Sequence, residues 1–206
     1  MTQQSYDYST RKGIRPISWN DFHGICKGLA QAVAPFDPQI ILAIGRGGFY
    51  PGTLLSHFLR VELYPVRITR RVRDVPTYDD PVWLLKPPEI ARGQRVLIVD
   101  EICGIGQTIA IVKAEAERLG AAAVRSAVMY AHTWGVDGAD VIGLITDELL
   151  LNPWDREIFE DGRFQFHPEY VEALQQQGVA PDESLLIGVE AAKVAKDLTP
   201  PPHPSP

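Results

Sequence analysis

The sequence predicts an α/β fold in which a buried parallel sheet alternates with helices. Residues 38–44 and 95–99 form two short apolar runs rich in β-branched residues, a pattern typical of strands that are covered on both faces. Each run leads through a glycine-containing turn into a helical pattern. Strands and helices that alternate in this way indicate a parallel sheet with right-handed crossovers. We therefore expect ligands beyond the carboxyl ends of the strands.

The other elements follow from periodicity and from start and stop signals. Ser18 and Asp21 form a predicted capping box for a first helix, which Pro35 ends. Further strands are expected over 61–69, 124–131 and 140–145, and further helices over 50–59, 108–119, 168–177 and 183–197. The first dozen residues are expected to be frayed, 70–81 to form a long mobile loop, and 152–155 to form a turn.

Length and composition exclude several classes of protein. A chain of 206 residues suits one domain of ordinary size. Its net charge of −6 argues against nucleic acid as a main partner. No apolar stretch is long enough to span a bilayer and no export signal is recognisable, so no membrane partner is expected. The two cysteines, Cys26 and Cys103, do not suggest a disulfide framework, and the cytoplasm is the expected location.

Two turns at this edge of the sheet carry residues suited to a phosphorylated ligand. Backbone N–H groups of residues 45–48 can face an anion, and Arg46 adds a forked donor suited to pyrophosphate. The alternative for this segment is a plain tight turn with an exposed arginine. The second turn, residues 103–108, leads into a helix whose first N–H groups can accept phosphate oxygens.

Between the strand and the second turn stand two carboxylates, Asp100 and Glu101. Because a buried carboxylate without a partner is costly, both should face a cleft or a ligand. At that position they can hold ribose hydroxyls or Mg²⁺. The alternative is a salt-bridged strand end.

Residues 96–108 resemble the phosphoribosyl-pyrophosphate (PRPP) signature of the type I phosphoribosyltransferases, and residues 42–52 resemble the pyrophosphate loop of their purine branch. Three positions depart from the signature: Cys103 replaces an aliphatic residue, Gly104 an acidic or small polar one, and Ile105 a hydroxyl residue. The resemblance implies a Rossmann-like sheet, a small hood, PRPP as substrate and Mg²⁺ as cofactor. The resemblance further implies that Asp100 binds the ribose hydroxyls and that Glu101 helps to hold the metal.

The resemblance also implies which residues contact PRPP. Arg46 and an arginine of the following strand end and loop neutralise the departing pyrophosphate. The candidates are Arg67, Arg70, Arg71 and Arg73, and the alternative for these four residues is a solvated cluster of charge. The expected PRPP-binding residues are Gly45, Arg46, Gly47, Arg70, Cys103, Gly104, Ile105, Gly106, Gln107 and Thr108.

The segment 147–155 resembles the hood of xanthine-guanine phosphoribosyltransferases. Leu149 falls where the family places a ring that stacks on the base, and Asp155 falls on the acid that meets the exocyclic amine. His132 occupies the place of a lysine that reads the base. It is either an electrophile or general base, or a strand-end histidine bonded to a carbonyl. Ile102 and Leu150 complete the expected base-binding set, and Asp100, Glu101, Arg46 and His132 the expected catalytic set.

We therefore expect a phosphoribosyltransferase domain over 14–165 with its hood near 145–165, a helical extension over 166–198, and a disordered proline-rich tail over 199–206. The expected activity is transfer of the 5-phosphoribosyl group from PRPP to a purine-like base, by a homodimer. The alternative is a non-catalytic PRPP or nucleotide sensor, which Gly104 motivates because glycine transfers no proton. A Rossmann-type oxidoreductase is disfavoured because no third glycine follows Gly106 at the required spacing.

Overall fold

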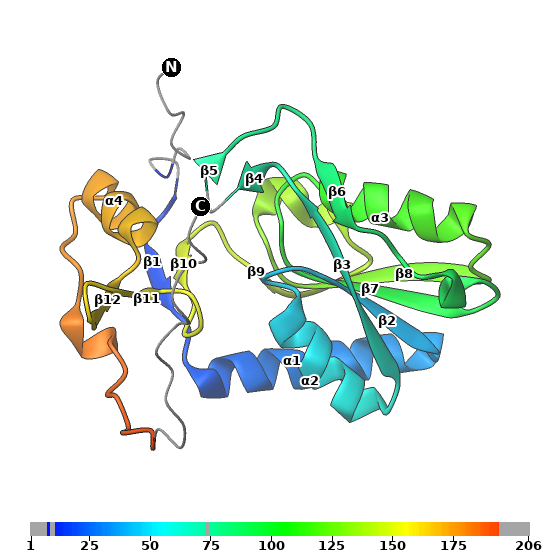
Figure 1. Cartoon of the computed structure of the whole chain (residues 1–206), viewed down its shortest axis with the longest axis horizontal. Helices are drawn as coiled ribbons and strands as arrows, with labels where there is room; N and C mark the ends of the chain where they lie inside the picture. Colours follow the sequence, from blue (N-terminus) through cyan, green and yellow to red (C-terminus); the bar gives the residue numbers. More distant parts are fainter. Residues whose placement is uncertain (1–7, 9–10, 73–74, 194–206) are drawn as a thin grey trace, which may run out of the picture.

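The computed structural model describes residue 8 and residues 11–72 and 75–193. Its centre is a six-stranded sheet in the order β6-β3-β2-β7-β8-β9 (Figure 1). All neighbours pair in parallel except β6, which lies antiparallel beside β3 at one edge. The strands are β2 (Ile40–Ile44), β3 (Glu62–Thr69), β6 (Val82–Leu85), β7 (Arg95–Cys103), β8 (Ala123–Ala131) and β9 (Val141–Ile145).

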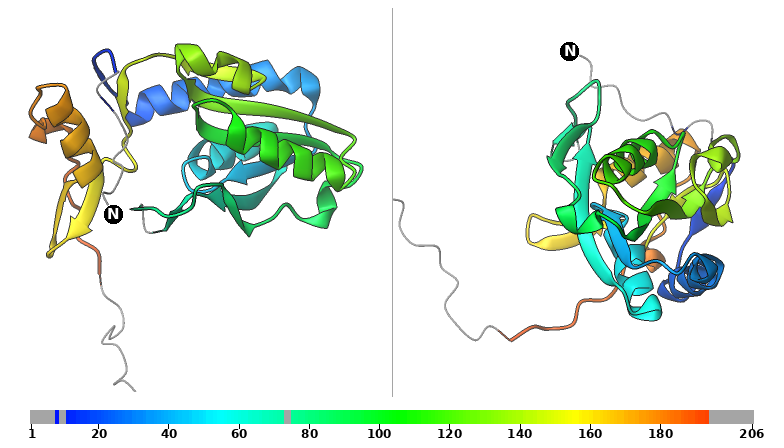
Figure 2. Two further views of the ribbon diagram at one scale, coloured as in Figure 1. Left: turned by 90° about the horizontal axis from the view of Figure 1, so that it is seen from above. Right: turned by 90° about the vertical axis from the view of Figure 1, so that its right-hand side faces the viewer.

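Helices cover both faces of this sheet. Helices α1 (Trp19–Val33) and α2 (Phe49–Leu59) lie on one face and α3 (Gln107–Arg118) on the other (Figures 1 and 2). The predicted capping box starts α1: the Asp21 N–H donates to Ser18 Oγ over 3.1 Å, and the Ser18 N–H donates back to the Asp21 carboxylate.

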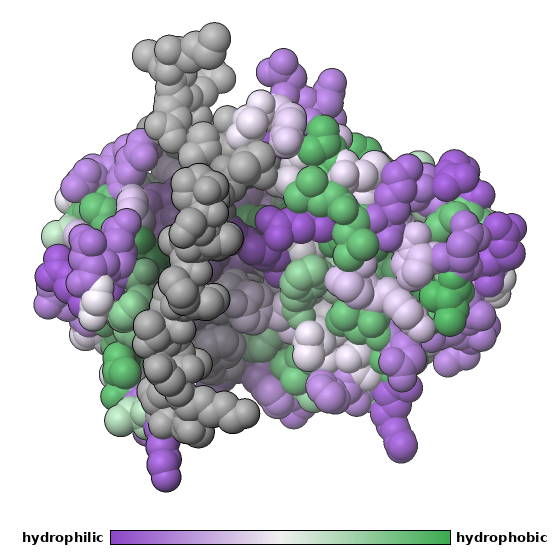
Figure 3. All heavy atoms as spheres, viewed as in Figure 1, coloured by the Kyte–Doolittle hydropathy of each residue, from purple (hydrophilic) through white to green (hydrophobic). Residues whose placement is uncertain are grey.

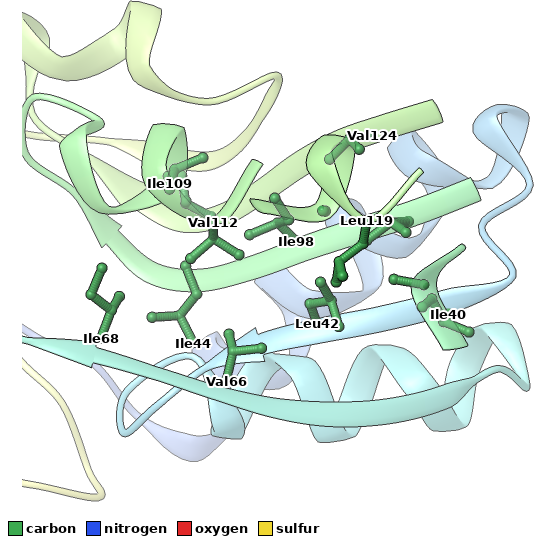
Figure 4. Packing of buried hydrophobic residues seen from close by; sticks show 14 of the residues in the cluster. Ile40, Leu42, Ile44, Val66, Ile68, Ile98, Ile109, Val112, Leu119 and Val124 are labelled. Carbon is green, nitrogen blue, oxygen red and sulfur yellow. The ribbon is translucent and has the colours of Figure 1, made fainter. Parts of the chain in front are cut away.

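Alternate residues of the central strands fill the two cores. On the α3 side Leu42 and Ile98 pack with Val112, as Figure 4 shows. On the opposite side Ile41 and Leu97 pack against α1 and α2. Each fully buried aliphatic side chain contributes about 1.5–3 kcal/mol, so these layers hold the strand ends rigidly.

A smaller part of the molecule stands beyond the carboxyl ends of the strands, at the left of Figure 1. Here β1 (Ile14–Pro16) pairs in parallel with β10 (Leu149–Leu151), and β11 (Glu157–Glu160) forms a hairpin with β12 (Arg163–Phe166). Helix α4 (Pro168–Gln176) packs on β10. The β1–β10 pair, the β11–β12 hairpin and α4 are together called the hood. Its own core is small and consists of Leu149, Leu151, Ala173 and Leu174.

The structure confirms the α/β class and places the first four predicted helices and four of the five predicted strands within about two residues of their expected bounds. The strand expected over 95–99 is longer, because β7 continues to Cys103 and includes the two acids. The segment 70–81 was wrongly expected to be a loop throughout, because β4 (Arg71–Val72) and β5 (Val75–Pro76) pair within it. The antiparallel β6 and the strands β1, β10, β11 and β12 were not predicted. Four short 3₁₀ turns complete the elements, at Ala34–Phe36, Glu89–Ala91, Thr133–Gly138 and Glu183–Leu185.

The helix expected over 183–197 is wrong within the described residues. Only the turn at Glu183–Leu185 forms, and residues 186–193 are irregular. This segment has too few apolar side chains at helical spacing to bury a face, and most of it is exposed. Residues 194–198, the proline-rich tail and most of the N-terminal segment lie outside the described residues. Tyr8 and Arg11, which are described, lie against the hood and the cavity.

Among the helices that the structure describes, we find none with the length and apolar character needed to cross a bilayer.

Candidate functional site

A cavity of about 660 Å³ lies between the sheet edge and the hood. In the space-filling view the surface is hollowed between these two parts (Figure 3). At the sheet its walls come from the turn after β2, the end of β3 and the end of β7. At the hood they come from β10, the residues that follow it and α4. Ten of the predicted site residues line this one cavity: Gly45, Arg46, Gly47, Glu101, Ile102, Gly104, His132, Leu149, Leu150 and Asp155.

The turn after β2 packs directly on the acidic end of β7. A Cβ at Gly47 would overlap the Glu101 carboxylate, and one at Gly48 would lie 2.6 Å from the Val99 carbonyl oxygen. Glycine is therefore required for the turn to approach β7 this closely. Arg46 lines the cavity beside this contact, and Arg67 lines it from β3. The two turns that the sequence predicted to converge thus lie at one edge of the sheet.

Asp100 and Glu101 point to opposite sides of β7, as consecutive strand residues do. Asp100 Oδ1 accepts the Glu101 N–H over 2.8 Å, and Glu101 accepts a hydrogen bond from the Asn152 amide. Burial raises the pKa of Asp100 to about 7. Burial, followed by the neighbouring charges of Asp155 and Asp100, raises the pKa of Glu101 to about 8. Neither carboxylate forms an ion pair within the described residues, so the salt-bridge alternative has no support there.

The predicted phosphate turn opens α3. Gly106 has φ +76°, which suits glycine, and no side chain caps the helix behind it. The first-turn N–H groups of α3 therefore have no side-chain acceptor from the cap residue. Arg70 reaches this turn and donates to Gln107 Oε1 over 2.6 Å.

Several predicted residues do not line the cavity: Arg70, Asp100, Cys103, Ile105, Gly106, Gln107 and Thr108. Cys103 is the last residue of β7 rather than part of the turn, and its thiol is buried and donates to the Gly135 carbonyl over 3.4 Å. Only its main chain can contribute to a phosphate site. Ile105, in contrast, is largely exposed.

His132 follows β8 and is only 4 % exposed. Its Nδ1 lies 2.8 Å from the Thr146 carbonyl oxygen, and its ring stacks on Trp134 with centroids 4.5 Å apart. Burial lowers the pKa of His132, and the charge of Arg11 acts in the same direction. The carbonyl-bonded arrangement, which the sequence left as one alternative, is therefore present in a residue that also lines the cavity.

Asp155 lies at the hood end of the cavity. Its Oδ1 accepts the Tyr170 hydroxyl over 2.9 Å, and burial raises its pKa. The neighbouring Trp154 stacks on Tyr50 with centroids 4.7 Å apart and an interplanar angle of 20°. This stack joins the hood to α2, so the hood is fixed to the sheet at the cavity wall.

Sequence reasoning missed several lining residues. Tyr8, Tyr50, Tyr130, Asn152, Glu157, His167, Glu169 and Tyr170 all face the cavity. Asn152 bridges Glu101 and the Tyr130 hydroxyl, 51 and 22 residues away in the chain. No local pattern reports contacts of this kind. The one available signal was the polar and aromatic content of 167–170, which read only as a helix start.

Comparison with known proteins agrees with this architecture. The model of the phosphoribosyl transferase domain family matches residues 18–145. A xanthine-guanine phosphoribosyltransferase of Idiomarina loihiensis is 25 % identical over 164 residues, which cover 78 % of this chain and 92 % of that protein.

Two solved structures share the fold. A purine phosphoribosyltransferase from Pyrococcus horikoshii has a TM-score of 0.62 at 24 % identity and covers 69 % of this chain and 94 % of its own. A Neisseria gonorrhoeae protein solved with bound ppGpp has a TM-score of 0.61 at 24 % identity. The match covers 70 % of this chain and 90 % of that protein. The family model spans every strand of the sheet and both turns at its edge, and the chain therefore belongs to the phosphoribosyl transferase domain family.

Proposed function

We propose that this protein transfers the 5-phosphoribosyl group from PRPP to a nitrogen of a purine-like base, with release of pyrophosphate, as in purine salvage. The observation that carries the proposal is the single cavity shared by the glycine turn at 45–47, the acidic end of β7 and the hood. One end offers main-chain donors and arginines, and the other offers apolar and acidic groups.

The phosphate end suits the departing pyrophosphate. Arg46 and Arg67 both line it, and Arg67 Nε is buried without a hydrogen bond in the part of the chain that the structure describes. Guanidinium groups bind phosphate oxygens strongly when water is excluded. Catalysis then rests on positioning the sugar and on neutralising charge as the C–O bond to pyrophosphate breaks. Arg70 is proposed to approach from the side of Gln107. Residues 103–108 are proposed to hold the 5′-phosphate.

The residues present fit a Mg²⁺ ion that arrives with its substrate. No group of three or more metal-ligating side chains occurs among the described residues. Mg²⁺ commonly uses one or two carboxylates together with substrate phosphates. Glu101 is the proposed ligand. Burial, followed by repulsion from Asp155 and Asp100, raises the pKa of its carboxyl, and a bound cation would relieve that repulsion. When bound, the metal supplies charge neutralisation at the pyrophosphate oxygens.

The base is proposed to lie against Ile102, Leu149 and Leu150, with Asp155 at its far edge. Leu149 is 3 % exposed and belongs to the hood core, so it offers dispersion contact in place of ring stacking. His132 is the proposed polar contact at the near edge.

The test is release of pyrophosphate from PRPP and Mg²⁺ with a panel of purine and related bases. Turnover above the blank supports the proposal, and Arg46→Ala should reduce it by at least a hundredfold. PRPP binding measured by calorimetry without turnover on any base would overturn the transferase and support the sensor alternative. The calorimetric measurement is included because Gly104 places no acidic side chain at this position.

Location and assembly are further proposals. Cys26 and Cys103 are both free and buried thiols, which suits a reducing cytoplasm. A homodimer is proposed, and sedimentation of the full chain at two concentrations tests it.

A further inference from the structure

At the edge of the acceptor pocket nearest β8, the Arg11 guanidinium lines the cavity beside two side chains that can accept hydrogen bonds, His132 and Glu148. The two are linked through Thr146, whose carbonyl oxygen meets His132 Nδ1 over 2.8 Å and whose hydroxyl donates to Glu148 Oε2 over 2.7 Å. A carbonyl oxygen can only accept, so Nδ1 must carry the hydrogen.

The hydrogen on Nδ1 determines what His132 offers to a ligand. In a neutral imidazole the other nitrogen, Nε2, is then an acceptor. His132 is only 4 % exposed, and its ring stacks on Trp134, which does not line the cavity. The hydrogen bond from Nδ1 to the Thr146 carbonyl determines which of the two ring nitrogens faces that carbonyl.

Burial favours the neutral form of His132. Burial lowers the pKa of His132 and the nearby Arg11 guanidinium acts in the same direction, whereas the hydrogen bond to the Thr146 carbonyl and the charge of Asp147 raise it. Asp147 is itself engaged by the Thr133 N–H at 2.9 Å and by the Thr133 hydroxyl. The Arg11 guanidinium lies over the Trp134 ring, 5.2 Å from its centroid.

From this geometry we infer that the base meets His132 with an N–H donor, so that the acceptor substrate is an amino-substituted heterocycle of the 6-aminopurine type rather than a 6-oxopurine. The inference rests on the proposed function and specifies its substrate class. An oxo group placed against Nε2 and the Glu148 carboxylate would oppose acceptor to acceptor and lose hydrogen bonding on both sides. A site built to hydrogen-bond one group discriminates strongly against its replacement.

His167 at the opposite side of the cavity has the complementary arrangement. Its Nδ1 accepts the Glu169 N–H over 3.2 Å, which leaves the hydrogen on Nε2 when the ring is neutral. A donor therefore stands on the hood side near Asp155, and an acceptor stands on the β8 side. The inference concerns only the edge that faces His132.

The kinetic test compares adenine and 2,6-diaminopurine with hypoxanthine and xanthine as acceptors, with PRPP and Mg²⁺ held constant. We expect kcat/KM to be at least tenfold higher for the amino bases. His132→Lys places a donor at the same point and should reverse the order, whereas His132→Gln should flatten it. Trp134→Phe keeps a ring behind residue 132 and should leave the order unchanged. Equal or better turnover of the oxo bases by the wild type would overturn the inference while leaving the transferase intact.

A second measurement needs no turnover. In ¹⁵N NMR spectra of the full chain at pH 7.5, His132 should show a protonated Nδ1 and an unprotonated Nε2, and adenine added with PRPP should shift Nε2. A protonated Nε2, or a shift with hypoxanthine and none with adenine, overturns the inference. If no base of any kind releases pyrophosphate, the proposed function fails. The Nε2 resonance then still shows whether His132 presents a hydrogen-bond acceptor at this edge of the pocket.

Discussion

The two ends of the cavity differ in how the chain builds them. The phosphate end comes from two short segments, residues 45–47 and 101–104, each of which is continuous in sequence and which contact one another. The acceptor end joins distant segments. The Tyr8 hydroxyl donates to Glu169 over 2.6 Å across 161 residues of sequence, and Tyr170 reaches Asp155 across 15. Binding of the activated sugar is thus determined locally, whereas the choice of base depends on tertiary packing.

The two ends also differ in what supports them. The phosphate end stands on the strands of the six-stranded sheet, with apolar cores on both faces. The hood has a core of four fully buried side chains. Less buried apolar area means a lower free energy of local opening. The acceptor end should therefore open first, and its residues should change base affinity without changing PRPP affinity.

The largest expected effect on activity comes from Gly47→Ala. The added methyl group must displace the Glu101 carboxylate or the turn itself, because a Cβ at this position overlaps Glu101. A displaced turn loses its aligned main-chain donors, so we expect kcat/KM for PRPP to fall by at least a hundredfold, or about 3 kcal/mol.

Gly28→Ala is the matched control, because a Cβ there meets nothing within 4 Å on an exposed face of α1. It should leave kinetics unchanged and raise the melting temperature slightly. Near-normal PRPP kinetics in Gly47→Ala would show that the contact between the two turns is not needed at the phosphate end.

Glu101 lies where the phosphate end and the acceptor end of the cavity meet. The largest expected effect on stability is on its pH dependence and comes from the titration of this residue. Its pKa of about 8 in the folded chain lies well above the ordinary value of 4.5. Between those values the folded protein holds a proton that the unfolded chain has released, so the free energy of unfolding falls as pH rises. Glu101→Gln removes this loss and keeps an acceptor for Asn152.

We expect Glu101→Gln to be more stable than the wild type by about 4–5 kcal/mol at pH 8.5, and nearly equal to it at pH 4.5. Urea unfolding at the two pH values measures the difference in the free energy of unfolding. A gain in stability that is independent of pH would assign the effect to packing instead of charge.

Sequence alone predicted that the glycine turn after β2 and the acidic end of β7 would meet, because each of these two parts is local. Of the predicted PRPP-binding residues, however, only Gly45, Arg46, Gly47 and Gly104 line the cavity. A β-branched run, two acids and a glycine turn each predict a local structure from a few consecutive residues. The capping box of Ser18 and Asp21 likewise predicted where α1 starts.

All five predicted base-binding residues line the cavity, but the contacts that hold the acceptor end together were not predicted, because the pairing of β1 with β10 and of Asn152 with Glu101 leaves no periodic pattern in the sequence. The tautomer of His132 likewise depends on a carbonyl 14 residues away.

A smaller effect is expected from Tyr170→Phe, which acts only on the acceptor end. The substitution removes the hydroxyl that donates to Asp155 over 2.9 Å and leaves a buried carboxylate short of one donor. A hydrogen bond to a charged group contributes about 1.5–3 kcal/mol. The KM for the base should therefore rise about tenfold, while the KM for PRPP stays constant. Tyr64→Phe on β3 is the control and should change neither constant, and a rise in both constants in Tyr170→Phe would mean that the two ends are mechanically coupled.

The smallest effect is expected at the exposed link between Arg70 and α3. Gln107→Ala removes the acceptor that holds Arg70 at the start of this helix, where the bond of 2.6 Å is exposed to solvent. Exposed hydrogen bonds contribute about 1 kcal/mol or less, so the KM for PRPP should rise about two- to threefold with base KM unchanged. Gln31→Ala, an exposed glutamine on α1, serves as the control for helix propensity. If Gln107→Ala lowered kcat for every base by tenfold or more, Arg70 would have to act on the reacting sugar from its position beside Gln107, and the phosphate end would extend beyond the residues that line the cavity.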